Sequence, residues 1–213
     1  MKNKGKYVIL SGPEGCGKTT IHQHLKKVFP DALFVREPGS SPLAEGIRSL
    51  LLDPNIGDMT PRQELHFFTA ARLDVILHEV QPARHSGRHV VSDRGWPETF
   101  AHQWWTGMGR KDLYRFLAEV DDEEIPFPDM WLYFDLDPEI GLSRRGKTSE
   151  VNRIDMQPLE YHRRVREGFM YLFERASFRR EMIDASKSIE EVQQQVVEIL
   201  TPLLLSNDVT LSS

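Results

Sequence analysis

Eight consecutive residues near the start of the chain have the pattern of a loop that binds phosphate. They are Gly12-Pro13-Glu14-Gly15-Cys16-Gly17-Lys18-Thr19, which fits G-x-x-x-x-G-K-[ST]. In such a loop the glycines let backbone N–H groups turn inward around a phosphate, the lysine bridges phosphates, and the threonine hydroxyl can ligate Mg²⁺. Cys16 fills a variable position of this pattern. The pattern therefore predicts a site for the phosphates of a nucleotide, with Lys18 as its candidate catalytic cation.

A second charged pair, Asp93-Arg94, directly follows the apolar run that includes Val90 and Val91. Open α/β sheets bind ligands at the carboxyl ends of their strands. A guanidinium group suits the geometry of phosphate, so Arg94 is a candidate for holding a second phosphate. Asp93 would orient Arg94 or act through water bound to Mg²⁺.

The elements that must position these residues alternate between short apolar runs and longer helical patterns, which is typical of a parallel sheet covered by helices. The expected strands are Tyr7–Ser11, Leu33–Arg36, His89–Ser92, Trp131–Leu136 and Met182–Asp184. The expected helices are Lys18–Val28, Leu43–Leu52, Pro61–Val80, Glu98–Trp105, Pro138–Arg145, Leu159–Phe178 and Ile189–Leu204. These elements predict an α/β fold, a three-layer P-loop NTPase sandwich with five parallel strands and helices on both faces. It would be a single domain over residues 1–205, followed by a flexible tail over 206–213.

Composition excludes several other classes. The 213 residues carry a formal charge of −5, which argues against a broad basic surface for nucleic acid or anionic membranes. Cys16 is the only cysteine, so an intramolecular disulfide and a cysteine cage for a metal are both impossible. The apolar run Tyr7–Leu10 is too short for a signal peptide or a membrane span. A cytoplasmic protein is expected.

Further stretches, spread over about residues 6–200, make the chain resemble the thymidylate kinase family. The matching stretches beside the phosphate loop are Arg36-Glu37-Pro38-Gly39, Phe68-Thr69-Ala70-Ala71-Arg72, Asp93-Arg94, Pro128-Asp129, Gly141-Leu142-Ser143-Arg144-Arg145, Asn152-Arg153-Ile154 and Ile183-Asp184-Ala185-Ser186. The resemblance implies the strand order 2-3-1-4-5, a homodimer, and transfer of the γ-phosphoryl of ATP, with Mg²⁺, to a pyrimidine deoxynucleotide monophosphate. For this family the acceptor is dTMP and the products are dTDP and ADP.

The resemblance also implies a role for each matching residue. The ATP site would contain Gly12, Gly15, Cys16, Gly17, Lys18, Thr19, Thr20, Arg144 and Ala185, with Thr19 and Asp93 at the metal. The acceptor site would contain Glu14, Arg48, Phe68, Arg72, Arg94, Thr99, His102 and Gln103. Phe68 would stack on thymine, Arg72 would donate to its O4 and Glu14 would approach the 3′-hydroxyl. A lid over about residues 144–155 would supply the catalytic cations Arg145 and Arg153, as in the bacterial-like subtype.

Three residues near the acceptor site depart from the family pattern. Gly95 replaces an aromatic residue or histidine, Glu98 stands where serine is common, and His102 replaces a tyrosine that senses the 2′ position of the sugar. Gly95 is expected to enlarge the pocket. The alternatives are therefore a kinase for dUMP or a 5-modified dUMP, a deoxynucleoside kinase, or a binding module that uses ATP without an acceptor.

Overall fold

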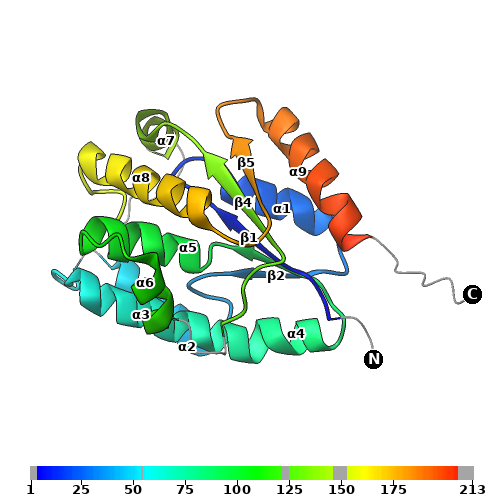
Figure 1. The fold of residues 1–213 in the computed structure, drawn as a ribbon, viewed down its shortest axis with the longest axis horizontal. Helices are drawn as coiled ribbons and strands as arrows, with labels where there is room; N and C mark the ends of the chain where they lie inside the picture. Colours follow the sequence, from blue (N-terminus) through cyan, green and yellow to red (C-terminus); the bar gives the residue numbers. More distant parts are fainter. Residues whose placement is uncertain (1–3, 54, 121–124, 146–152, 206–213) are drawn as a thin grey trace, which may run out of the picture.

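The central sheet contains five parallel strands. The computed structural model describes residues 4–53, 55–120, 125–145 and 153–205. Its strands are β1 (Tyr7–Ser11), β2 (Leu33–Arg36), β3 (Val90–Asp93), β4 (Met130–Asp135) and β5 (Arg180–Asp184). They lie in the order β2-β3-β1-β4-β5, so the predicted sheet and its strand order are confirmed (Figure 1). The expected tail 206–213 and residues 146–152 of the expected lid lie outside the described ranges.

Helices connect the strands. They are α1 (Lys18–Val28), α2 (Pro42–Leu52), α3 (Pro61–Val75), the π-helical turn η1 (Ile76–Val80), α4 (Gln81–His85), α5 (Trp96–Thr99), the π-helical segment η2 (Phe100–Gly107), α6 (Leu113–Val120), α7 (Pro138–Arg145), α8 (Leu159–Arg175) and α9 (Ile189–Leu204). A capping box of Thr60 and Gln63 begins α3, where the Thr60 hydroxyl accepts from Gln63 N–H. In the described ranges, no helix is long and apolar enough to cross a membrane.

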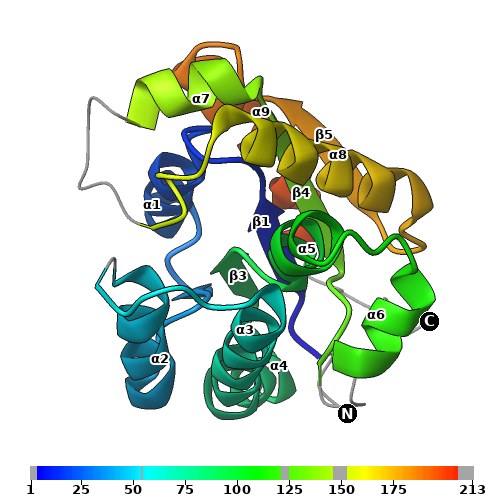
Figure 2. The ribbon, with the colours of Figure 1, turned by 90° about the vertical axis from the view of Figure 1, so that its left-hand side faces the viewer.

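The two faces of the sheet are buried by different helices, because successive residues of a strand point to opposite faces. Tyr7 and Ile9 of β1 pack with apolar residues of α2, α3, η2 and α8. Val8 and Leu10 pack with α1 and α9 on the other face. Figure 2 shows α2 and α3 side by side, and α8 farther along the sheet, beside β4 and β5. The central strands β1, β3 and β4 are buried along almost their whole length, which explains the apolar runs at their positions in the sequence, whereas the edge strand β5 exposes Glu181, Met182 and Asp184.

Several element boundaries differ from the prediction. Helix α6 was not predicted; its residues Leu113, Phe116 and Leu117 lie on one face, and Phe116 packs edge-on against Phe100. The long helix expected over Pro61–Val80 widens into η1 just before Pro82, whose ring cannot continue the regular α-helical pattern. Helix α8 ends at Arg175 instead of Phe178.

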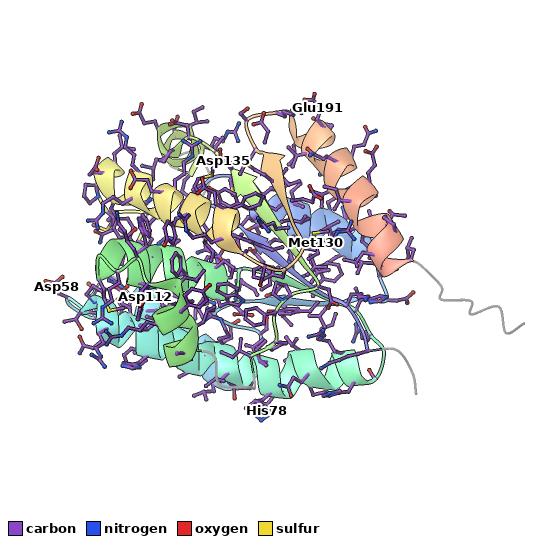
Figure 3. All side chains as sticks on the ribbon, viewed as in Figure 1. Asp58, His78, Asp112, Met130, Asp135 and Glu191 are labelled. Atoms are coloured by element: carbon purple, nitrogen blue, oxygen red, sulfur yellow. The ribbon has the colours of Figure 1, made fainter. Side chains whose placement is uncertain are left out.

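The carboxyl ends of the strands form the edge that carries the predicted site residues. Figure 3 labels Met130 and Asp135 at the two ends of β4, and the end at Asp135 lies toward α7. From β1 the chain runs to β2 at one edge of the sheet, and from β3 it runs to β4, which lies on the opposite side of β1. The crevice at such a reversal is where open α/β sheets bind ligands. In this sheet the crevice lies between the loop that follows Ser11 and the end of β3 at Asp93. Asp93 is paired in register with Leu10 of the neighbouring strand β1.

Candidate active site

The loop between β1 and α1 forms a cradle for phosphate. Lys18 is 5 % exposed, and its ammonium group donates to the carbonyl oxygens of Gly12 at 2.5 Å and Pro13 at 3.0 Å, which holds it inside the loop. A pocket at this loop is lined by the predicted donor-site residues Gly15, Cys16, Gly17, Lys18, Thr19 and Thr20, together with Glu14, Arg94, Arg144, Arg145 and Ile189. We call it the donor pocket.

Helix α7 is held against this loop by two glycines. Gly15 has a φ of 74°, and a Cβ added to it would lie 2.0 Å from the carbonyl oxygen of Gly141. Only glycine allows this approach. It places the last turn of α7, with Arg144 and Arg145, at the rim of the donor pocket. Arg144 also donates to the carbonyl of Ala185 at 2.8 Å, which places Ala185 beside the same pocket. Gly12 begins the loop but does not line the pocket.

Thr19 and Asp93 lie together, as a shared metal ion requires. The Thr19 hydroxyl donates to Asp93 Oδ2 at 3.3 Å, and Asp93 Oδ1 is buried without a hydrogen-bond partner in the described part of the chain. Oxygen ligands of this kind suit Mg²⁺, which usually takes only one or two from the protein and keeps water or phosphate oxygens for the rest. No cluster of three or more acidic, histidine or cysteine side chains suitable for a metal occurs among the described residues. The donor set therefore fits a Mg²⁺ ion that is carried mainly by phosphate.

Arg94 joins the donor pocket to a second pocket. It lines both of them and pairs with Glu14 at 2.7 Å. Burial alone would raise the pKa of Glu14, but the charges of Arg94 and Lys18 outweigh it and hold that pKa well below its usual range. Arg94 has a φ of 78°, a conformation that costs a non-glycine residue about 1–3 kcal/mol. Strain of this kind is concentrated at functional sites.

Arg48 lies close to the same group of positive charges. It donates to the carbonyl of Pro38 at 3.2 Å. Burial, together with the charges of Arg36 and Arg94, lowers the pKa of Arg48 to about 10. Burial is the largest of these causes, and the nearby charges of Arg36 and Arg94 act in the same direction. Arg48 does not itself line either pocket.

The second pocket, which we call the acceptor pocket, contains most of the residues predicted for the acceptor. Its lining is Glu37, Pro38, Phe68, Arg72, Arg94, Gly95, Glu98, Thr99, His102, Gln103 and Ile154. Phe68 and Arg72 come from α3, four residues apart and therefore on one face of the helix. The pocket combines an aromatic ring, a buried guanidinium and, through Arg94, a connection to the donor pocket.

Arg72 is fixed by three hydrogen bonds and has one donor group left over. Its guanidinium donates to Glu37 Oε2 at 2.8 Å, to the Gly95 carbonyl at 3.1 Å and to the Thr99 hydroxyl at 2.7 Å. The side chain is 3 % exposed. Its Nη1 is buried and has no hydrogen-bond partner within the described residues. Because an unpaired buried donor is costly, a ligand oxygen in this pocket is a natural partner for Nη1.

Comparison with known proteins identifies the family to which this site belongs. A family model described as "Thymidylate kinase" matches residues 10–196. A thymidylate kinase of Geobacillus sp. (strain WCH70) is 38 % identical over 196 residues, which cover 89 % of this chain and 92 % of that protein. A thymidylate kinase of Bacillus mycoides (strain KBAB4) is 33 % identical over 209 residues, or 95 % of this chain and 100 % of that protein. The chain belongs to the thymidylate kinase family.

One expected departure from the thymidylate kinase pattern has a different consequence from the one predicted. Gly95 was expected to widen the acceptor pocket by omitting a side chain. A Cβ at Gly95 would lie 2.8 Å from the Cδ1 atom of Ile9, so it would point into the core beneath β1. The expectation was wrong because the three atoms nearest to such a Cβ all belong to the Ile9 side chain.

Glu98 and His102, the other two residues that depart from the thymidylate kinase pattern, are titratable groups in the wall of the acceptor pocket. Glu98 accepts from Ser11 Oγ at 2.9 Å and Gly95 N–H at 3.0 Å, and burial raises its pKa to about 7. His102 lies 3.0 Å from the Tyr161 hydroxyl through Nδ1. Burial and then the charge of Arg94 lower the pKa of His102 to about 3, so this ring is neutral at physiological pH. The pocket wall therefore gains no cation from His102.

The two candidate lid arginines of the catalytic set lie in different places. Arg145 lines the donor pocket and pairs with Asp155 at 3.2 Å. Arg153 lies on the acceptor side, where it pairs with Glu64 of α3 at 2.7 Å and does not line the donor pocket. The structure thus brings Lys18, Arg94 and Arg145 together, and Arg153 stays apart from them.

Three residues of this thymidylate kinase site were not predicted from the sequence. Glu37 is the buried partner of Arg72, although its stretch was one of those that resemble the family. Glu64 lies four residues before Phe68, and that spacing was the available signal. Tyr161 lies within the helix expected over Leu159–Phe178, and no local signal in the sequence connects it with His102.

Proposed function

We propose that this thymidylate kinase transfers the γ-phosphoryl of ATP to dTMP and yields dTDP and ADP. The observation that carries the proposal is that Arg94 lines two adjoining pockets, one formed by a phosphate-binding loop and the other by Phe68 and Arg72. A reaction between two phosphate groups requires such a common boundary. The matched family and its relatives support the same reaction.

The acceptor pocket has the chemistry of a pyrimidine with a carbonyl at position 4. Nη1 of Arg72 is a donor without a partner among the described residues, and thymine O4 is an acceptor, whereas cytosine carries an amino group there. Phe68 supplies an aromatic surface next to this donor. Facing an amino group instead of O4 would leave the donor unpaired at a cost of about 1–3 kcal/mol, or roughly ten- to a hundredfold in discrimination.

The chain's own residues act mainly by binding and neutralising anions. An oxygen of the acceptor phosphate forms a bond to the γ-phosphorus while the bond from that phosphorus to the β–γ bridging oxygen breaks, and ADP leaves. The acceptor phosphate is already an anion, so no side chain has to remove a proton. Lys18 in the loop, Arg94 at the boundary and the arginines of α7 offset charge that develops during transfer.

Mg²⁺ is the proposed cofactor, with Thr19 and Asp93 as the residues that would hold it. When bound with ATP, this ion neutralises and orients the phosphates. The Thr19 hydroxyl donates to Oδ2 of Asp93 at 3.3 Å, and the buried Oδ1 of Asp93 has no partner in the described ranges. We also propose that residues 144–155 act as a lid, that Arg153 is catalytic, and that the protein is a cytoplasmic homodimer that binds neither nucleic acid nor membranes. The family resemblance and the net charge support these further points.

An assay of ADP release tests the function directly. ATP and Mg²⁺ are mixed with the protein and with dTMP, dUMP, 5-hydroxymethyl-dUMP, dCMP or dGMP in turn, and ADP is measured by coupled oxidation of NADH. We expect the highest kcat/KM with dTMP. Activity on thymidine but not on dTMP would instead identify a nucleoside kinase. ATP hydrolysis without dependence on any acceptor, together with no rise in melting temperature on adding dTMP, would reduce the protein to an ATP-binding module.

A further inference from the structure

Glu64 connects the acceptor pocket with Arg153. Its Oε1 pairs with Nη1 of Arg153 at 2.7 Å, and its Oε2 accepts from Nε2 of Gln103 at 2.9 Å. Each carboxylate oxygen of Glu64 therefore has one partner, Arg153 for Oε1 and Gln103 for Oε2. The Glu64 side chain is 14 % exposed and Gln103 is 2 % exposed, so the arrangement is largely shielded from water.

The chemistry of a carboxylate fixes which way the Gln103 amide faces. An ionised carboxylate only accepts hydrogen bonds, while an amide group has a donating nitrogen and an accepting oxygen. Gln103 must therefore turn its NH₂ group toward Glu64. Because Gln103 also lines the acceptor pocket, its carbonyl Oε1 remains as the group that can accept a hydrogen bond there.

Three residues of α3 then act along one face of the helix. Glu64, Phe68 and Arg72 follow one another at intervals of four residues, which places them in a row. Phe68 and Arg72 line the pocket directly, and Glu64 acts on it through Gln103. The pocket thus offers a donor, Nη1 of Arg72, and an acceptor, Oε1 of Gln103. Thymine and uracil present the complementary pair, an accepting O4 beside a donating N3–H, and cytosine presents the reverse.

We propose that Glu64 is a positioning residue for base selection, which orients the Gln103 amide so that the acceptor pocket favours thymine or uracil over cytosine. This inference rests on the proposed function, since it concerns the acceptor of that same reaction. Arg153 is part of the arrangement because it binds the other carboxylate oxygen of Glu64. Arg153 also donates through Nε to the Leu51 carbonyl at 3.3 Å, and the next residue, Ile154, forms part of the pocket wall.

The substitution Glu64→Gln tests the proposal with almost no change in shape. Arg153 can only donate, so it will bind the single remaining oxygen at position 64 and turn the new NH₂ group toward Gln103. Gln103 must then reverse its amide and present a donor to the pocket. We expect the ratio of kcat/KM for dTMP to that for dCMP to fall about tenfold, as for one buried hydrogen bond replaced by an unpaired contact.

Glu198→Gln is the matched control. Glu198 accepts from Gln194 Nε2 at 2.9 Å, the same kind of contact at the same distance, but on an exposed part of α9. It should leave the dTMP/dCMP ratio unchanged. If Glu64→Gln also leaves the ratio unchanged while the melting temperature falls, Glu64 has only a structural role and the proposal is overturned.

A second variant tests the same contact from the other side. Gln103→Leu removes the carbonyl from the pocket and should lower the dTMP/dCMP ratio as Glu64→Gln does. Combining the two substitutions should change the ratio no further, because Glu64 acts through Gln103. If the dTMP/dCMP ratio falls further in the double variant than in either single variant, the proposal is overturned. If Glu64→Gln does not fold, Gln103→Leu is the deciding variant, and an unchanged dTMP/dCMP ratio in it overturns the proposal. Failure of the proposed function has a different signature, namely that the unaltered protein does not use dTMP.

Discussion

Replacing Arg72 by lysine separates the charge of this side chain from its geometry. Lysine keeps a positive charge that can face Glu37, but its single nitrogen cannot reproduce the several fixed donors of a guanidinium. Two contacts made by Nη2, to the Gly95 carbonyl and the Thr99 hydroxyl, should be lost. At about 1 kcal/mol for each, the expected loss is about 2 kcal/mol of unfolding free energy. For a chain of this size, that lowers the melting temperature by about 4–8 °C.

The same substitution should have a separate effect on the acceptor. Loss of the donor at Nη1 leaves thymine O4 without its partner, so we expect kcat/KM for dTMP to fall about ten- to a hundredfold. Activity toward dCMP should fall much less, because cytosine has no acceptor at that position. The assay is coupled ADP release with each nucleotide, and the melting temperature is measured on the same preparations.

Arg84→Lys provides the control for buried arginine. Arg84 donates through Nε to the Gly5 carbonyl and through Nη2 to Asp129, both at 2.9 Å, and it does not line the acceptor pocket. It should lower the melting temperature without altering the preference for dTMP over dCMP. The reasoning about Nη1 is refuted if Arg72→Lys behaves like Arg84→Lys, with reduced stability and an unchanged preference.

Three further predictions concern other parts of the site. Lys18→Ala should lower kcat at least about a hundredfold without unfolding the protein, because the hydrogen bonds of the ammonium group within the described residues all go to its own loop; circular dichroism and steady-state kinetics check this. Glu98 holds a proton in the folded state up to a pKa of about 7, so its contribution to stability is present below pH 4.5 and is lost as pH rises toward 7. Glu98→Gln should therefore stabilise the protein at pH 8 by an amount on the order of 3 kcal/mol, with the gain disappearing near pH 4.5 in urea titrations. Arg153→Ala should lower kcat far more than it raises KM for dTMP, as proposed for a catalytic arginine; an unchanged kcat in steady-state kinetics would remove Arg153 from catalysis.

The fold and the donor pocket could be predicted because their signals are local. The phosphate loop is a run of eight residues whose order dictates its shape, and it lies between a strand and a helix. The central strands β1, β3 and β4 are buried on both faces, so each shows a short apolar run. Phe68 and Arg72 could be paired because helical spacing alone places them on one face.

The missed features depend on contacts between distant segments. Glu64 meets Arg153 only after α3 and the segment before α8 have packed together, and no spacing rule relates positions 89 residues apart. The burial of Glu98 and the direction of the absent side chain at Gly95 likewise depend on tertiary packing around β1. Helix α6 is a different case, because its apolar spacing was visible but extends over only eight residues.

The contact between Gly15 and Gly141 makes an otherwise inert position important for the reaction. A Cβ on Gly141 would lie 2.2 Å from the carbonyl oxygen of Glu14, so even alanine there would force the two backbones apart. Helix α7 would then carry its arginines away from the donor nucleotide. The substitution Gly141→Ala would therefore lower activity although the added methyl group contacts no substrate. A search restricted to side chains that contact the ligands would not find this position.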